Sequence, residues 1–452
     1  MALPVAGTAK MPNPWWVGIV SGMASYIDAA AIVSNGIALV IYQDSIGLSG
    51  SEFGWLSGVL TFCIAIGALV GGRLGDAIGR RTVFTATMAM IAVGSALMVF
   101  GTAFPVLLAG VVLVGLGTGA DLPVSLATIS EAATDKNRGA LLGLSNLLWG
   151  VGILATTLIA SFAGHLGRLG GQIMYGHIVV VALVLLLLRI GIPESPYWLK
   201  ARDERHRGIG TNRAEHVHFT DLFKSPYAKP FIALLVFYCL TNLAASTGGM
   251  FGTYIAVNVV GISVELNSRL GLLTFPLGLI GGALFMKLVG TRHRMTLFGA
   301  GAVLFVSAYA IPAVFGFSLT TLVLTMLLSI VGGALAFEGI MKVWTQESFP
   351  TMLRSTAQGS IIAASRVFAA TLAVFTPTLV EYNPRLTYTG LFVTVAVGLG
   401  VAWLTFRNQA RNEFDTEGET DADRAADPGR AADPGRAADP GRADRPVSPP
   451  YV

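Results

Sequence analysis

Twelve long apolar segments, separated by short polar ones, run through the sequence and leave few folds open to it. A helix needs about 20 mostly apolar residues to cross the hydrocarbon core of a bilayer. We expect membrane spans with the following bounds: 15–42, 53–71, 82–100, 105–131, 139–164, 172–192, 230–260, 266–289, 294–315, 319–346, 354–380 and 386–406. Charged residues make up only 12% of the chain, against about a quarter in soluble domains, so a set of soluble domains is excluded.

The spans divide six and six at the longest polar interruption. We expect an N-terminal six-helix bundle over 1–192, a cytoplasmic connector over 193–229, a C-terminal six-helix bundle over 230–406 and a disordered cytoplasmic tail over 407–452. The tail repeats Ala-Ala-Asp-Pro-Gly-Arg, which blocks regular structure. An internal repeat supports the division, because Glu131 and Arg138 recur as Glu347 and Arg354. The sequence therefore predicts an all-α membrane protein with twelve transmembrane helices in two pseudo-symmetric six-helix bundles.

The distribution of basic residues predicts the orientation of the chain. One side of the membrane would carry the cluster at 73–81, the connector and most other Lys and Arg residues. The opposite side would carry only Arg168, Arg269 and Arg385. Because basic residues favour the cytoplasmic side, we expect a multi-pass protein of the cytoplasmic membrane with both termini in the cytoplasm.

Residues 71–81 form a short charged hairpin between the second and third expected spans and read Gly-Gly-Arg-Leu-Gly-Asp-Ala-Ile-Gly-Arg-Arg. The glycines allow a tight turn, and the charges place the hairpin at a membrane surface. The stretch resembles the loop between the second and third helices of the major facilitator superfamily, whose pattern is Gly-x-Leu-x-Asp-x-x-Gly-Arg-Arg/Lys. The resemblance implies a loop that latches the two halves in the outward-open state. The residues assigned to this latch are Gly72, Asp76, Gly79, Arg80 and Arg81.

Further motifs resemble the sugar-porter and related "sugar and other" branch of the superfamily, which includes transporters of organic ions and aromatic acids. Residues 193–199 read Pro-Glu-Ser-Pro-Tyr-Trp-Leu, with Tyr197 where arginine is usual. The repeated pairs also resemble cytoplasmic motifs of this branch, so Glu131, Arg138, Glu347 and Arg354 join the expected conformational latch. The chain lacks the sugar porters' terminal Pro-Glu-Thr-x-Gly, which leaves sugars, polyols and organic acids all open as substrates.

Ionisable residues inside the expected spans point to the transport chemistry. Such residues cost several kcal/mol in lipid, so they are expected to face protein or water and to have a function. The four that stand out are Asp28, Asp121, Glu338 and Arg366. Because burial disfavours the charged form of a carboxyl group, we assign proton coupling to Asp28, Asp121 and Glu338.

Each carboxylate also has a structural interpretation. Asp28 can hydrogen-bond to a neighbouring helix, and Asp121 can satisfy backbone groups that Pro123 leaves free. Glu338 can pair with Lys342, four residues further along the same helix face.

Polar and aromatic residues of the helices that border the expected cavity form the predicted substrate site: Asn35, Asn146, Trp149, Asn242 and Arg366. Asn35 is seven residues from Asp28 and shares its helix face. Arg366 either holds an anionic group of the substrate or neutralises Glu338.

We therefore predict a secondary active transporter that moves a small polar metabolite by alternating access, with proton-coupled uptake. Its partners would be the substrate, protons and the lipid bilayer, with no nucleic acid, and the protein would be a monomer. No phosphate-binding loop, metal-ligand spacing or Ser/His/Asp set occurs, so we expect no enzyme activity, metal or cofactor. Two alternatives stay open: a proton-driven exporter of the same architecture, and a non-transporting membrane sensor on the same scaffold. The fifth span lacks the Gly-Pro pattern of drug–proton antiporters, which favours uptake.

Overall fold

The computed structural model describes residues 12–133, 138–194, 199, 219–349 and 351–407. All regular structure in these residues is helical, and 12 helices are long and apolar enough to cross a membrane. The first half of the chain forms α1 (Pro14–Ile46), α2 (Gly50–Ile78), α3 (Arg80–Phe100), α4 (Phe104–Ala132), α5 (Arg138–Ala163), η1 (Gly164–Leu166) and α6 (Arg168–Ile190). The second half forms η2 (Phe219–Phe223), α8 (Ala228–Ile255), η3 (Ala256–Val260), α9 (Val264–Leu288), α10 (Arg294–Phe315), α11 (Leu319–Ala336), α12 (Glu338–Ser348), α13 (Thr351–Tyr382) and α14 (Pro384–Phe406).

The expected spans match these helices, and the span expected over 319–346 corresponds to Leu319–Thr345. Its helix is interrupted between α11 and α12 at Phe337, which has φ −121° and ψ −109°. The ring of Phe337 stacks on Tyr238 with centroids 5.1 Å apart, so the non-helical backbone is held by packing against α8. The break makes Glu338 the first residue of α12 and places it in the interior of the expected span.

Local sequence signals explain where several helices begin. Ser49 and Glu52 form a reciprocal capping box at the start of α2. The side chain of Asn383 accepts a hydrogen bond from Leu386 N at the start of α14. Gly79 joins α2 to α3 with φ 101°, a backbone conformation that glycine adopts without strain.

Small residues let helices of the first half pack closely. Gly67 and Gly71 face α4, where a side chain on either would meet the backbone near Leu116 and Ala120. In return, Gly115 and Gly119 of α4 lie against Cys63 and Ile64 of α2. The smooth face of α2 expected from its glycine spacing is therefore the face that packs on α4.

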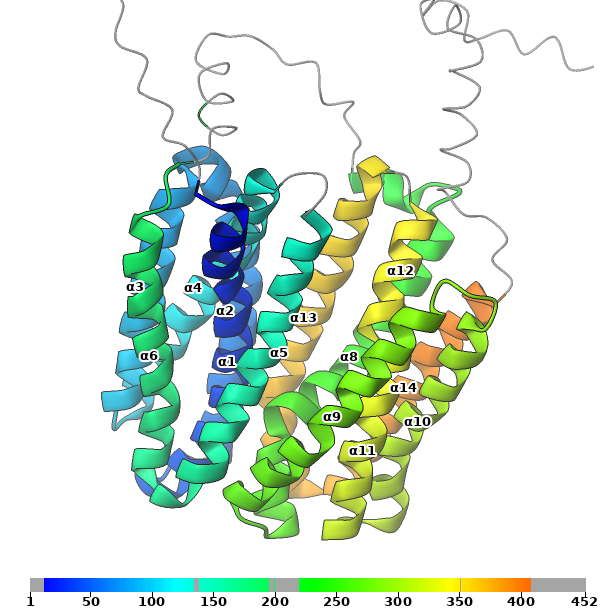
Figure 1. Ribbon diagram of the computed structural model, residues 1–452. Coiled ribbons are helices and arrows are strands. Elements are labelled where there is room, and N and C mark those ends of the chain that lie inside the picture. The colour runs from blue at the N-terminus through cyan, green and yellow to red at the C-terminus, as the bar shows by residue number, and fades with distance from the viewer. Residues whose placement is uncertain (1–11, 134–137, 195–198, 200–218, 350, 408–452) are drawn as a thin grey trace, which may run out of the picture.

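The helices gather into two bundles that lie side by side, α1–α6 in one and α8–α14 in the other (Figure 1). We call the end of the molecule that carries Gly79 the hairpin end and the end that carries Gly47 the distal end. Described contacts between the bundles are concentrated towards the distal end. There, Gly54 and Gly58 of α2 pack on Val374 of α13, and His165 lies 3.6 Å from Glu265.

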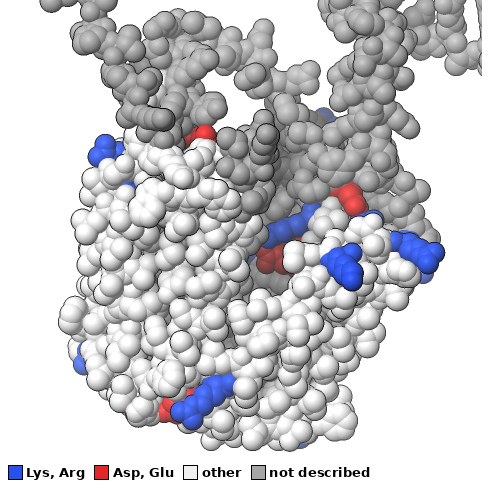
Figure 2. All heavy atoms as spheres, viewed as in Figure 1, with Lys and Arg blue, Asp and Glu red and all other residues white. Residues whose placement is uncertain are grey.

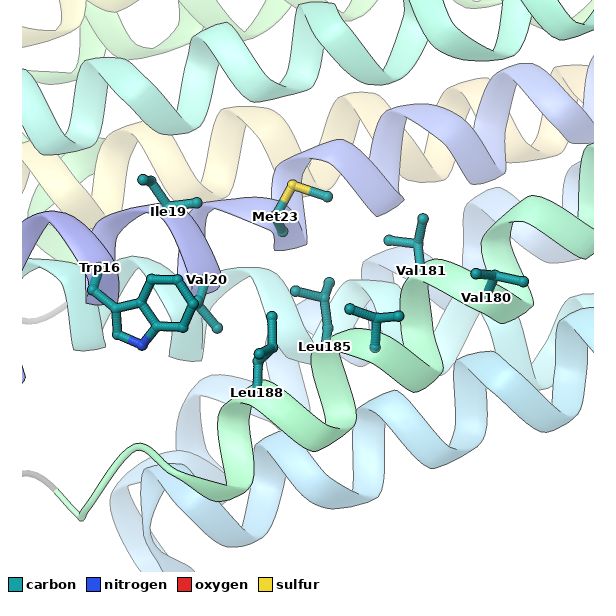
Figure 3. A pocket seen from close by; sticks show the side chains of 9 residues that line it. Trp16, Ile19, Val20, Met23, Val180, Val181, Leu185 and Leu188 are labelled. Carbon is teal, nitrogen blue, oxygen red and sulfur yellow. The ribbon is translucent and has the colours of Figure 1, made fainter.

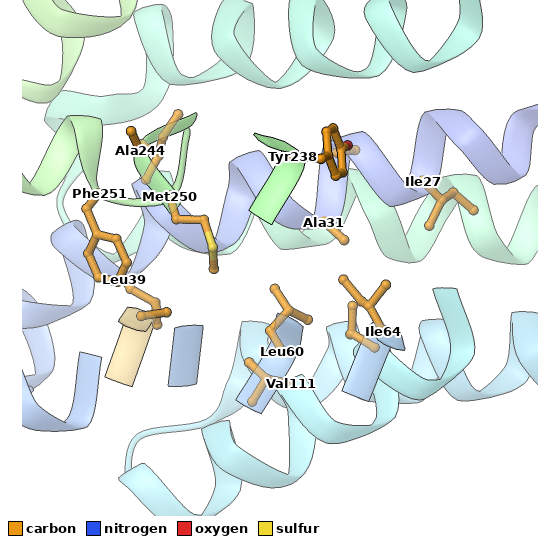
Figure 4. Close-up of a cluster of buried hydrophobic side chains, with 14 of the residues drawn as sticks. Ile27, Ala31, Leu39, Leu60, Ile64, Val111, Tyr238, Ala244, Met250 and Phe251 are labelled. Carbon is orange, nitrogen blue, oxygen red and sulfur yellow. The ribbon is translucent and has the colours of Figure 1, made fainter. Parts of the chain in front are cut away.

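Apolar side chains fill the interface between the two bundles at the distal end. Phe53 of α2 contacts Phe251 and Tyr254 of α8, with ring centroids 5.4 Å and 5.1 Å away. Figure 4 shows Leu39 and Leu60 of the first bundle near Met250 and Phe251 of the second. Above mid-height, on the side of the hairpin end, a hollow with basic and acidic side chains inside it lies between the bundles (Figure 2). The described contacts between the bundles therefore close the distal end.

Candidate transport site

Asp28 lies near the middle of α1 and is almost fully enclosed, with 2% of its surface exposed. The indole N–H of Trp149, on α5, donates a 3.4 Å hydrogen bond to its Oδ2 atom. Its Oδ1 atom is buried and has no hydrogen-bond partner among the described residues. An enclosed carboxyl oxygen without a partner costs free energy unless a proton or a ligand satisfies it. Asp28 is therefore suited to take up one or the other.

Charges from the second bundle act on this carboxyl group. Arg366 of α13 and Glu338 of α12 both interact electrostatically with Asp28. The same two residues also act on the hydroxyl group of Tyr238, on α8. Asp28 of the first bundle thus lies within electrostatic reach of Glu338 and Arg366 of the second.

Glu338 and Lys342 form an ion pair across one turn of α12, with Oε1 and Nζ 2.7 Å apart. Both side chains are about half exposed, at 47% and 40%. Of the two partners that the sequence offers to Glu338, the structure shows Lys342 and not Arg366.

The hydrogen bond of Asn242 ties α8 to the helix that carries Arg366. Its side-chain amide donates to the backbone carbonyl of Ser365 over 3.4 Å. Ser365 immediately precedes Arg366 on α13. Asn242 is thus placed to fix the position of Arg366.

Asp121 lies in a different environment from Asp28. Its carboxylate forms an ion pair with Arg189 of α6 inside the first bundle, and the two side chains are only 1% and 2% exposed. It also accepts a 3.0 Å hydrogen bond from Thr87, and Ser125 lies 3.4 Å from its second oxygen. Asp121 is therefore already neutralised within one bundle, and Asp28 is the aspartate that lies opposite Glu338.

Arg189 is a functional candidate that sequence reasoning missed. It donates to the carbonyl oxygens of Val20 and Ser21 on α1 and lies 4.5 Å from the centroid of the Phe84 ring. It therefore links α1, α3, α4 and α6. The signal was present, since Arg189 is the only charge in the expected span 172–192.

Asn35 lies within the first bundle as well. It is fully buried, donates to Ser57 over 3.3 Å and accepts a 3.1 Å hydrogen bond from Tyr175. These partners on α2 and α6 occupy the amide group. In this conformation Asn35 does not meet the open hollow.

The expected latch residues near the hairpin end form pairs within each bundle. Arg80 lies 3.0 Å from Glu131, and Arg294 lies 2.6 Å from Glu347. The partners are 51 and 53 residues apart in sequence, so the two pairs are pseudo-equivalent. In the second half the contact is made by the turn between α9 and α10, where residues 290–294 do not repeat the motif of residues 71–81.

The hairpin at residues 71–81 also contacts Glu194, the second residue of the motif at 193–199. Glu194 accepts hydrogen bonds from the backbone N–H groups of Arg80 and Arg81, at 2.8 Å and 3.2 Å. These are the first N–H groups of α3, which a carboxylate stabilises. Gly72 and Gly79 lie in α2 and at its end. The side chains of Asp76, Arg138, Asn146 and Arg354 lie outside the described part of the structure.

A second hollow lies on the outer face of the molecule between α1 and α6 (Figure 3). It is lined only by apolar side chains, including Trp16, Met23 and Leu188. Lipid-facing surfaces have this composition, and a polar metabolite finds no hydrogen-bonding group there. This outer hollow is therefore not a candidate site for a polar metabolite.

The fold and this site define a membrane transporter with two helical halves around a central polar cavity. Residues 15–374 match the family model described as Major Facilitator Superfamily. The chain is 32% identical over 365 residues to the minor myo-inositol transporter IolF of Bacillus subtilis (strain 168), covering 80% of this chain and 83% of the relative. It is 27% identical over 354 residues to the putative niacin/nicotinamide transporter NiaP of the same organism, covering 77% and 84%.

Among solved structures, the chain resembles a D-xylose-proton symporter with a TM-score of 0.71 and 17% identity, covering 87% of this chain and 98% of that one. The likeness at this identity shows the fold. Because the family model covers most of the chain, the protein belongs to the major facilitator superfamily. It is a transporter and not an enzyme.

Proposed function

We propose that this transporter couples the uptake of a small polar metabolite to protons, with Asp28 as the group that carries the proton. The observation that supports this most directly is the buried Oδ1 atom of Asp28, which has no partner among the described residues. Glu338 shares the site but is held by Lys342, and Asp121 is held by Arg189. Asp28 is thus the carboxyl group of the three that is free to gain and lose a proton.

The positive charge around residues 73–81 supports a cytoplasmic location for the hairpin end, and we place both termini on the same side of the membrane. Because the described contacts close the distal end, we assign an inward-facing conformation. In this conformation substrate and proton leave Asp28 and its surroundings for the cytoplasm. Rocking of the two bundles about this site would expose the same groups to the outside. A single chain contains both halves, so we expect the monomer to transport.

The substrate is a small polar metabolite. Relatives are named for myo-inositol and for niacin or nicotinamide, which are small polar compounds. The site combines an indole N–H, a carboxyl group and a guanidinium group, which suits hydroxyl or carboxylate groups of a ligand.

The test is accumulation of such compounds in proteoliposomes with an acid-outside gradient. We expect gradient-driven uptake in the parent protein. Asp28→Asn should abolish accumulation and retain exchange of labelled for unlabelled substrate, because the proton site is lost and the cavity remains. The matched control is Asp44→Asn, which removes an exposed carboxylate from the same helix. Unchanged accumulation in Asp28→Asn would contradict the assignment, and gradient-driven efflux would identify an exporter instead.

A further inference from the structure

Arg366 is an intramembrane cation without a close partner. Within the described residues its guanidinium group makes no hydrogen bond or ion pair, although it is only partly exposed. Two other cations within the expected spans are paired, Arg189 with Asp121 and Lys342 with Glu338. Because an uncompensated charge inside a membrane protein is costly, a bound anion would stabilise Arg366.

Among the charged groups of the site, one can act as the counter-ion of Arg366. Glu338 and Lys342 cancel each other. Among the described residues of the site, Asp28 is then the carboxyl group whose ionised form can balance Arg366, and the two groups interact electrostatically. Protonation of Asp28 removes that balance and leaves the site with a net positive charge. An anionic ligand bound to Arg366 restores the charge balance of the site.

The helices packed around Asp28 supply no other free charge among the described residues. Its surroundings include the indole of Trp149 on α5 and the phenol of Tyr238 on α8. On α6, His177 points its Nδ1 atom at the carbonyl oxygen of Met174, a contact within its own helix. The other charged groups on α4, α6 and α12 are Asp121, Glu131, Arg168, Arg189, Glu338, Lys342 and Glu347. All but Arg168 form ion pairs, and Arg168 donates to the carbonyl oxygens of Phe100 and Gly101.

We propose that the substrate carries one carboxylate group, that this group pairs with Arg366, and that it binds together with a proton on Asp28. This inference rests on the proposed function and names the substrate class of the same site. The fork of an arginine matches a carboxylate with two parallel hydrogen bonds. By linkage, a proton on Asp28 strengthens the binding of the anion, and the bound anion strengthens the binding of the proton to the same degree.

Charge movement distinguishes this class from neutral substrates. One proton and one monocarboxylate cross together with no net charge, so transport is electroneutral. One proton with a polyol carries a positive charge inward and produces a current. Currents from proteoliposomes on a solid-supported membrane therefore report the substrate class directly.

The experiment compares pairs that differ in the carboxylate: nicotinate with nicotinamide, and D-gluconate with D-sorbitol, with myo-inositol as a fifth compound. In proteoliposomes of the full chain under an acid-outside gradient, we expect at least one carboxylate to accumulate at least tenfold more than its neutral partner, without current. Accumulation of neutral compounds with an inward current, and of neither carboxylate, overturns this inference and leaves the proposed function standing. Failure of all five to accumulate removes the proposed function as well.

Variants at Arg366 separate charge from folding. Arg366→Gln should raise the apparent KM for the accumulated carboxylate at least tenfold. Arg366→Lys should keep transport electroneutral with a smaller rise, because the charge remains and the fork is lost. Arg292→Gln, which removes an exposed arginine between α9 and α10, is the matched control. An unchanged KM in Arg366→Gln overturns the pairing. Asp28→Asn should bind the carboxylate with an affinity that no longer depends on pH, and a retained pH dependence also overturns it.

Discussion

Arg189 and Asp121 form an ion pair that is enclosed by protein, since their side chains are only 2% and 1% exposed. The pair joins α6 to α4, and the same guanidinium group donates to the carbonyl oxygens of Val20 and Ser21 on α1. One side chain thus fixes the position of the helix that carries Asp28. Because the pair is enclosed, we expect it to stabilise the packing of α1, α4 and α6.

Breaking the pair should destabilise the protein. Arg189→Gln leaves the Asp121 carboxylate buried without its partner, which we expect to cost about 3–5 kcal/mol. The measurement is thermal unfolding of the purified protein in detergent. The double variant Asp121→Asn with Arg189→Gln should be less destabilised than Arg189→Gln alone, because no uncompensated charge remains. An unfolding temperature of Arg189→Gln equal to that of the parent would rule out this role.

Close packing of α2 on α4 gives a second prediction. A methyl group on Gly119 would overlap the carbonyl oxygen of Ile64, so Gly119→Ala should destabilise the protein by about 1–3 kcal/mol. Gly400→Ala, in α14, meets no atom within 4 Å and should be neutral or slightly stabilising. Thermal unfolding of the two variants side by side tests the contact. Equal stability of both would show that the two helices are not in tight contact.

The membrane spans could be predicted because length and apolar character alone decide whether a helix crosses a bilayer. The break at Phe337 could not, since it depends on the stacking of its ring against Tyr238, a contact with another helix. Among the candidate site residues, Asp28 and Arg366 could be proposed from the sequence because a charge inside a span is unusual.

The placement of Asn35 shows why the remaining site residues were harder to predict. Asn35 shares a helix face with Asp28, as the spacing of seven residues predicts. It nevertheless lies nearer the distal end, where Ser57 and Tyr175 enclose it. The sequence gives the face of a helix but does not give the height at which the cavity closes. That height depends on how the bundles meet.

The pseudo-equivalent pairs at the hairpin end predict matched local effects. Glu131→Gln removes the charged partner of Arg80, and Glu347→Gln removes that of Arg294. Each loss is expected to weaken its own helix end by about 1.5 kcal/mol, typical of a hydrogen bond to a charged group. Amide hydrogen exchange should rise in the first turn of α3 in Glu131→Gln and in the first turn of α10 in Glu347→Gln. Each variant is the control for the other, and a rise at both sites in either variant would contradict independent pairs.

Closure of the distal end depends on the contact of Phe53 with the second bundle. Phe53 is fully buried between Phe251 and Tyr254, and opening of the distal end would separate these rings. Aromatic pairs contribute about 0.5–1.5 kcal/mol each beyond the burial of their surface. Phe53→Ala should therefore shift the population towards distal-open conformations by at least about tenfold, which corresponds to about 1.4 kcal/mol.

Distances between the bundles measure this shift. Spin labels on cysteines at Asp44 and Leu266, both exposed and on opposite bundles, report the separation of the distal ends once Cys63 and Cys239 have been replaced by alanine. Phe53→Ala should add a longer distance to the distribution. Phe62→Ala, on the lipid-exposed face of the same helix, should leave the distribution unchanged. A parent-like distribution in Phe53→Ala would mean that other contacts hold the distal end closed, since the loss of two aromatic pairs across the bundles would then have no effect on the equilibrium.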